Sequence, residues 1–91
     1  MNWVARVSVL PKAEVLDPQG AAILGALGHL GFGDVTAVRG GRLFHLHITT
    51  TDRDEAERIA GDAARRLLAN TVVETYEVTV EPLPIEEAVT S

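Results

Sequence analysis

The sequence predicts an α+β fold, a two-layer sandwich in which two helices cover one face of a four-stranded, mostly antiparallel sheet. Three observations predict it. Segments that alternate apolar and polar residues open and close the chain, capped segments with helical spacing lie between them, and a Gly-Gly pair separates two further strand-like runs. A chain of 91 residues has room for one modest core. We expect one domain over residues 1–82 and a flexible tail over residues 83–91.

The first strand is predicted over residues 3–10. Its odd-numbered residues are apolar, whereas Arg6 and Ser8 lie on the opposite face, which is the pattern of a half-buried strand. Pro11 ends the strand because it has no N–H to donate to the ladder.

The first helix is predicted over residues 18–30. Asp17 can accept a hydrogen bond from the first turn, and Pro18 is favourable at the first helical position. Gly31 stands where a left-handed C-terminal cap is expected. Glycines inside a helix are unfavourable, so we expect Gly20 and its neighbouring glycines to pack closely against the sheet or a partner.

Residues 35–39 and 43–51 form two strand-like runs, and the Gly40-Gly41 pair between them predicts a β-hairpin. In the second run, even-numbered residues are apolar and mark the core face, whereas His45 and His47 lie on the other face. The apolar residues are Phe44, Leu46 and Ile48.

A second helix is predicted to begin after Asp52, because Glu55 follows it at the spacing of a capping box. Its apolar stripe ends at Leu67, and its charged residues lie on the solvent side. A last strand follows over residues 72–80. The order β-α-β-β-α-β is that of a ferredoxin-like architecture.

Composition excludes several classes of function. The formal net charge of −5, with scattered basic residues, argues against nucleic-acid binding. The chain has no cysteine, which excludes disulfides and thiolate chemistry and is compatible with the cytoplasm. No run approaches the ~20 apolar residues of a membrane span, and the N-terminus does not resemble a secretory signal. We expect a soluble, cytoplasmic protein that binds neither nucleic acid nor membrane.

No set of residues has the pattern of a catalytic site. His45 and His47 share a strand face, as a two-histidine metal site would require, but a plain polar face is the favoured interpretation. Arg39 and Arg42 beside the glycine pair could hold an anion, although a charged hairpin turn is commonplace. We therefore expect no catalytic residue, no metal and no cofactor. An amino-acid-sensing module of the ACT type remains an alternative.

Three segments together resemble a known family. They are Val15-Leu16-Asp17-Pro18-Gln19-Gly20, then Val35-Thr36-Ala37-Val38-Arg39-Gly40-Gly41-Arg42, then Leu67-Leu68-Ala69-Asn70-Thr71-Val72-Val73-Glu74-Thr75-Tyr76. The sequence resembles PurS, the small-subunit family of phosphoribosylformylglycinamidine synthase, over residues 3–81. One departure is that Gly40 is followed by Gly41 and Arg42, where the family usually has lysine.

The resemblance implies a PurS-like fold and a non-catalytic assembly role in purine biosynthesis. In this family's complex, a large subunit uses ATP and magnesium, a glutaminase subunit releases ammonia from glutamine, and the small subunit helps to join the two. The small subunit is expected to form a homodimer or a dimer of dimers. The resemblance marks as candidate subunit-contact or family-motif residues Asp17, Pro18, Gly20, Arg39, Gly40, Arg42, Asn70, Thr71 and Tyr76.

Overall fold

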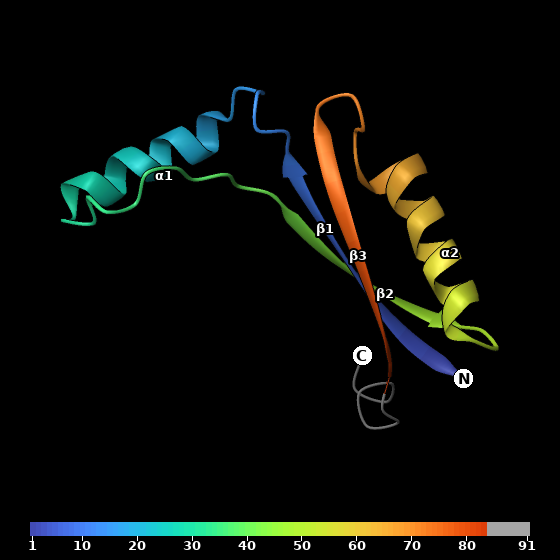
Figure 1. Cartoon of the computed structure of the whole chain (residues 1–91). Coiled ribbons are helices and arrows are strands. Elements are labelled where there is room, and N and C mark those ends of the chain that lie inside the picture. The colour runs from blue at the N-terminus through green and yellow to red at the C-terminus, as the bar shows by residue number, and fades with distance from the viewer. Residues whose placement is uncertain (84–91) are drawn as a thin grey trace.

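A computed structural model of the chain describes residues 1–83. Its elements, in order, are β1 (Asn2–Pro11), α1 (Pro18–His29), β2 (Arg42–Thr49), α2 (Arg53–Ala63), the π-helical turn η1 (Ala64–Leu68) and β3 (Glu74–Pro82). Of the predicted tail over residues 83–91, all but Leu83 lies outside the described residues. The three strands and α2 pack together, whereas α1 stands apart from them (Figure 1).

The sheet has three strands in the order β2-β1-β3, and both pairs of neighbours are antiparallel. In the centre of the sheet, Val7 of β1 lies opposite Phe44 of β2 and Val78 of β3. These side chains share one face, and α2 covers that face. The predicted core face of β1 and β2 is therefore confirmed, although Val4, on the opposite face of β1, is also buried.

The core under α2 is narrow. Val7 and Val9 are fully buried, and the sheet is covered by the methyl groups of Ala56 and Ala60 in α2 and of Ala64 in η1, which are also fully buried. Small side chains allow the helix backbone to approach the sheet closely, so that few large residues suffice to fill the space between the layers.

The end of the second helix differs from its prediction. The Ala69 N–H donates to the Ala64 carbonyl at 2.9 Å, an i→i+5 bond that widens the last turn into a π-helix. As a result Ala69 packs in the core, whereas Leu67 is 82% exposed. The last apolar residue of the predicted stripe thus points away from the sheet.

The helix caps were predicted correctly. Asp17 accepts from the Gly20 N–H, and Asp52 accepts from the Glu55 N–H at 2.8 Å. Gly31 adopts φ +94°, and the Phe32 N–H beyond it donates to the Leu27 carbonyl, as in a Schellman C-cap.

The predicted hairpin and fourth strand are wrong. Residues 35–41 are extended, but the chain does not reverse at Gly40-Gly41, and residues 35–39 are not part of the sheet. The physical reason is local. The Gly40 N–H is bonded to Asp17, and Gly41 lies so close to β1 that an added Cβ would be 2.0 Å from the Val9 carbonyl oxygen. These contacts direct residues 35–39 away from β2 (Figure 1).

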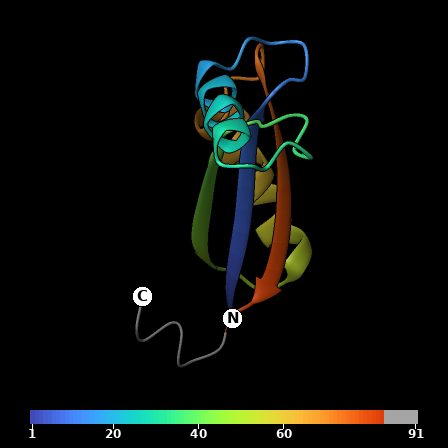
Figure 2. The ribbon, with the colours of Figure 1, turned by 90° about the vertical axis from the view of Figure 1, so that its left-hand side faces the viewer.

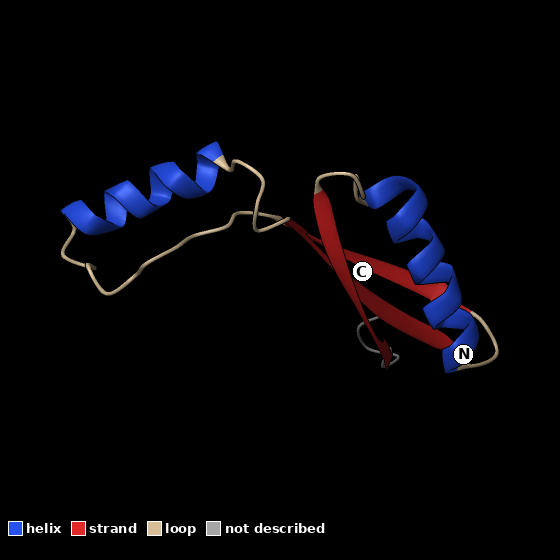
Figure 3. Cartoon of the chain, turned by 45° about the horizontal axis from the view of Figure 1, so that its top comes forward, coloured by secondary structure: helices blue, strands red, loops and turns tan. Residues whose placement is uncertain are grey.

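The expectation that both helices cover one face of the sheet is also wrong. Only α2 does so, while α1 and the extended segment project together beyond one end of the sheet (Figure 3). We call residues 12–41 the arm. With the arm extended, the radius of gyration is 16.6 Å, whereas a compact chain of this length would have about 12 Å.

Candidate functional site: the arm and its junction with the sheet

Asp17 holds the base of the arm. Its carboxylate accepts hydrogen bonds from the Gly20 N–H at 3.1 Å and from the Gly40 N–H at 2.9 Å. The first bond caps α1, and the second ties the start of that helix to the segment that returns to β2. One side chain thus holds together the two segments that connect the arm to the sheet, one leading from β1 and the other returning to β2.

Glycines make this junction possible because the backbones approach closely. A Cβ at Gly20 would lie 2.2 Å from the Val38 carbonyl oxygen, and one at Gly40 would lie 2.9 Å from the side-chain oxygen of Gln19. Gly25 and Gly28 have open space around them instead. Close packing is therefore confirmed for Gly20 alone, and its neighbour is the arm's own return segment rather than the sheet or a partner.

Two arginines complete the junction. Arg39 donates to the Pro11 carbonyl at 2.9 Å. Arg42 donates to both carboxylate oxygens of Glu74, at 2.8 and 3.0 Å. Glu74 also accepts from the Asn70 N–H at 2.7 Å. Arg42 and Glu74 therefore join the start of β2 to the start of β3 and its preceding loop, Arg39 joins the arm to the end of β1, and both arginines that could have held an anion are already bonded.

The carboxylates of the junction have shifted pKa values. The Gly40 N–H, followed by that of Gly20, holds the pKa of Asp17 below its usual range. For Glu74, the Asn70 N–H is the main cause of a lowered pKa, and Arg42 adds to it. Both groups are thus more stable as anions in the folded chain, which suits structural bonds rather than proton transfer.

The arm itself presents an apolar surface. Helix α1 contains no Asp, Glu, Lys or Arg, and only Gly20 in it is buried. Leu16 is 83% exposed, Leu30 72% and Phe32 55%. Between α1 and the return segment lies a groove of about 490 Å³, lined mainly by apolar residues that include Val15, Leu24 and Val38. Exposed apolar surface of this kind marks an interaction site.

Most of the candidate residues meet at the junction. Asp17, Gly20, Arg39, Gly40, Arg42 and Asn70 all contribute a contact there. Pro18 is exposed at the first turn of α1, and Thr71 is exposed in the loop before β3. Tyr76 lies elsewhere, half-buried in the core cluster that Val7 and Val9 form with η1. Sequence reasoning did not select Glu74 as a candidate residue. Glu74 begins one edge strand and Arg42 begins the other, and this shared position was a signal that could have identified it.

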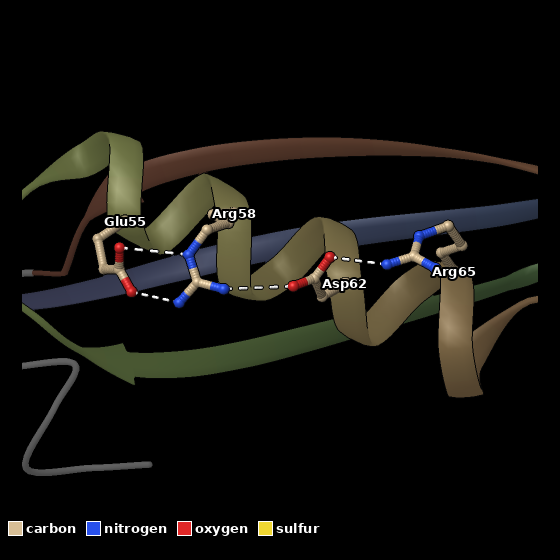
Figure 4. A network of polar contacts seen from close by, with 4 residues as sticks. All are labelled: Glu55, Arg58, Asp62 and Arg65. Atoms are coloured by element: carbon tan, nitrogen blue, oxygen red, sulfur yellow. Dashed lines mark hydrogen bonds and ion pairs between the residues drawn. The ribbon is translucent and has the colours of Figure 1, made fainter.

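Other charged groups have the character of a solvated surface. Glu55, Arg58, Asp62 and Arg65 form a ladder of ion pairs along the exposed side of α2 (Figure 4).

His45 and His47 are both exposed on the open face of the sheet. Within residues 1–83, no three His, Cys, Asp or Glu side chains are grouped so that they could hold a metal ion. None of the helices described is long and apolar enough to span a bilayer.

Comparison with known proteins identifies the family. The family model described as PurS, phosphoribosylformylglycinamidine (FGAM) synthase, matches residues 4–82. The chain is 49% identical over 78 residues to the PurS subunit of this enzyme from Mycobacterium leprae, covering 85% of this chain and 94% of the relative.

Solved structures agree with this match. PurS from Thermus thermophilus is 35% identical and has a TM-score of 0.82, over 92% of this chain and all of the other. A chain in the structure of PurLQS from Thermotoga maritima is 30% identical, with a TM-score of 0.81 over 89% of this chain and 99% of the other. Alignments this long include much of the arm. The chain therefore belongs to the PurS family, the small subunit of phosphoribosylformylglycinamidine synthase.

Proposed function

We propose that this chain is the non-catalytic assembly subunit that joins the glutaminase to the large ATP-dependent synthetase and supports ammonia transfer between them. The observation that carries the proposal is the arm, an apolar segment left without a partner in a chain of the PurS family. The relative within PurLQS supports it, since that structure contains a PurS chain in a larger assembly. The complex acts in purine biosynthesis, which favours a cytoplasmic location.

The chemistry of the complex belongs, in this proposal, to the other two chains. The junction's charged groups are bonded to each other or to backbone groups, so they serve structure rather than turnover. We propose that this chain binds no cofactor itself, and that the partner subunits use ATP, magnesium and glutamine.

We also propose that the chain associates with itself, as a homodimer or a dimer of dimers. A folded chain of this size has a thin stability margin, and burial of exposed apolar surface in an oligomer would increase it. Such burial would cover Leu16, Leu30 and Phe32 of the arm, which are 83%, 72% and 55% exposed.

Co-elution tests the proposal directly. The chain is mixed with purified large subunit and glutaminase in the presence of glutamine and Mg-ADP, and the mixture is run on gel filtration with light scattering. We expect one peak that contains all three chains and that separates into its parts when this chain is left out. Elution of this chain apart from both partners under these conditions would contradict the proposal.

An amino-acid sensor is less well supported. Its site would lie in the groove beside the start of α1, where the ligand needs free groups for its ammonium and carboxylate. Asp17 and Arg39, the charged residues that line the groove, are already bonded to Gly40 and to the Pro11 carbonyl. We expect flat calorimetric titrations with amino acids; saturable binding to the isolated chain would favour the sensor.

A further inference from the structure

The open face of the sheet, which α2 does not cover, has an apolar residue near one end. Figure 2 looks onto this face, with α2 behind the strands. Val4 lies on it, on the side of β1 away from the core, and is only 4% exposed. Its partners in the register, His47 on β2 and Glu81 on β3, are both polar. A valine kept from water here marks this end of the open face as a place where further apolar side chains are stabilised by burial.

A hollow lies at the same end of the sheet, where β1 begins. Its volume is about 190 Å³, and its lining residues are Asn2, His47, Ile48, Thr49 and Leu83. The Leu83 N–H donates to the Asn2 carbonyl at 2.9 Å, which continues the pairing of β3 with β1 by one residue. Since side chains alternate along a strand, Leu83 lies on the open face, as Asn2 and His47 do. The hollow therefore has room for one aliphatic side chain directly beside the last described residue.

The chain continues past this hollow with residues 84–91, which lie outside the described structure and have the sequence Pro-Ile-Glu-Glu-Ala-Val-Thr-Ser. We call them the tail. Ile85 is the first apolar side chain after Leu83, and two residues span at most about 7 Å, so the hollow is within its reach. Eight residues span at most about 29 Å, whereas β3 and β2 are about 10 Å apart across β1. The tail is therefore long enough to cross the open face.

Charges on the open face favour a crossing from β3 towards β2. The tail carries two adjacent carboxylates, at residues 86–87. On the open face, β3 contributes the carboxylates of Glu77 and Glu81, whereas β2 contributes the imidazoles of His45 and His47. A neutral imidazole still has one N–H to donate. A tail that crosses to β2 thus moves its carboxylates away from like charges and towards hydrogen-bond donors.

We propose that the tail folds back over the open face of its own chain, with Ile85 in the hollow and Glu86 and Glu87 directed towards His47. The tail then covers the end of the open face that contains Val4. This contact lies within one chain and involves neither the arm nor another subunit, so it goes beyond the assembly role. In consequence, this end of the open face is closed to other chains as long as the tail is in place.

Disulfide formation tests the fold-back, since the natural chain has no cysteine. Ala88→Cys lies in the tail beyond the two glutamates, and His45→Cys is exposed on the open face, so both the hollow and His47 stay intact. The five residues from Leu83 to Ala88 span at most about 18 Å, which suffices when the tail crosses to β2. In the A88C/H45C double variant we expect a disulfide within each chain, formed about tenfold faster than in a control pair, because docking raises the effective concentration of the two thiols.

The matched control pairs Ala88→Cys with Asp54→Cys, which is exposed in the first turn of α2, on the other side of the sheet. The neighbouring Arg53 donates to the Val80 carbonyl, so this turn lies beside the end of β3 and within reach of the tail. A tail without a fixed position would visit both sites, so equal rates for the two pairs would overturn the proposal. Disulfides between chains in A88C/H45C, seen on non-reducing gels, would overturn it too, since the tail would then lie on another copy.

Ile85→Ser tests the use of the hollow. Added to the A88C/H45C variant, it should slow the disulfide to the rate of the control pair, because a serine gains little from burial in the hollow. Val89→Ser, beyond the tail cysteine, should leave the rate unchanged. A rate that Ile85→Ser does not alter would show that Ile85 does not hold the tail, and would overturn the proposal.

NMR on the natural chain provides a second measurement. We expect nuclear Overhauser contacts between the Ile85 methyl groups and the His47 ring. In a chain that ends at Leu83, the amide signals of Asn2 and His47 should shift, whereas that of Arg65, on the exposed side of α2, should not. Absence of the Ile85 contacts from the natural chain would overturn the proposal. The co-elution experiment makes no use of the tail, so its outcome and that of the fold-back are decided separately.

Discussion

Asp17 shows how one residue links local structure to the shape of the molecule. Its position before Pro18 predicts a helix cap, and the bond to the Gly20 N–H confirms it. Its second bond, to the Gly40 N–H, joins residues that are 23 positions apart. No spacing rule predicts that bond, because it depends on where the folded chain brings Gly40. The cap was therefore predictable, whereas the junction was not.

Replacing Gly20 with alanine should destabilise the junction. The new Cβ would lie 2.2 Å from the Val38 carbonyl oxygen, and overpacking of this kind costs about 1–3 kcal/mol. Gly61→Ala, at a half-buried position of α2 where an added Cβ would have open space around it, is the matched control and should stabilise the chain by about 0.5–1 kcal/mol. Urea unfolding monitored by circular dichroism measures both. Equal effects at the two sites would contradict the close contact at Gly20.

Acid should weaken the junction through Asp17. Its pKa is lowered in the folded chain by the N–H groups of Gly40 and Gly20, so its contribution to stability is present above the pKa of an unfolded aspartate, about 3.9, and is lost as the pH falls through the lower folded value. Asp17→Asn removes this titration. Unfolding between pH 2 and pH 6 should therefore show a difference between the variant and the natural chain that shrinks on acidification. A constant difference would exclude the ionised carboxylate as the cause.

At the scale of elements, local patterns predicted each helix start and the buried face of each strand in the sheet. The failure lies at Gly40-Gly41. A glycine pair permits a tight turn but does not require one, and here Asp17 and the close approach of Gly41 to β1 hold the chain open. The segment 35–39 keeps its strand-like conformation and lacks only a partner. The sequence pattern thus predicted the extended conformation of this segment correctly, but it could not predict that the segment lies outside the sheet.

A longer connection should let the arm close on its own sheet. Three glycines inserted between Gly40 and Gly41 would free the chain to reverse while Gly40 stays bonded to Asp17. We expect a monomer whose radius of gyration falls from 16.6 Å towards about 12 Å, measured by small-angle scattering with light scattering. The same insertion between Thr71 and Val72, both exposed in a loop, should leave the radius of gyration unchanged. A radius of gyration that stays near 16.6 Å with the first insertion would show that the junction is not what holds the arm open.

At the scale of the whole molecule, the chain is elongated, with extents of 49 × 31 × 17 Å. Its core is small, and much of its apolar surface lies on the arm, outside that core. A chain built in this way gains stability from partners, which is what an assembly subunit requires.

Dimerisation should depend on Leu43 and not on Leu67. Both are exposed, at 61% and 82%, but only Leu43 lies on β2, an edge strand of the sheet. Burial of a leucine side chain stabilises by about 1.5–3 kcal/mol, so Leu43→Ser should raise the dimer dissociation constant by about tenfold or more. Leu67→Ser should leave it unchanged. Sedimentation over a concentration series measures both constants, and equal changes would contradict the assigned surface.

We propose that this chain supports the delivery of ammonia without performing chemistry itself. The measurement that tests it most directly compares two activities of the large subunit and glutaminase, one with glutamine and one with ammonium salt as the nitrogen source. Addition of this chain should raise the formation of formylglycinamidine ribonucleotide from glutamine several-fold and leave the ammonium-dependent rate unchanged. Equal stimulation of both rates would contradict the account, and so would no stimulation of either.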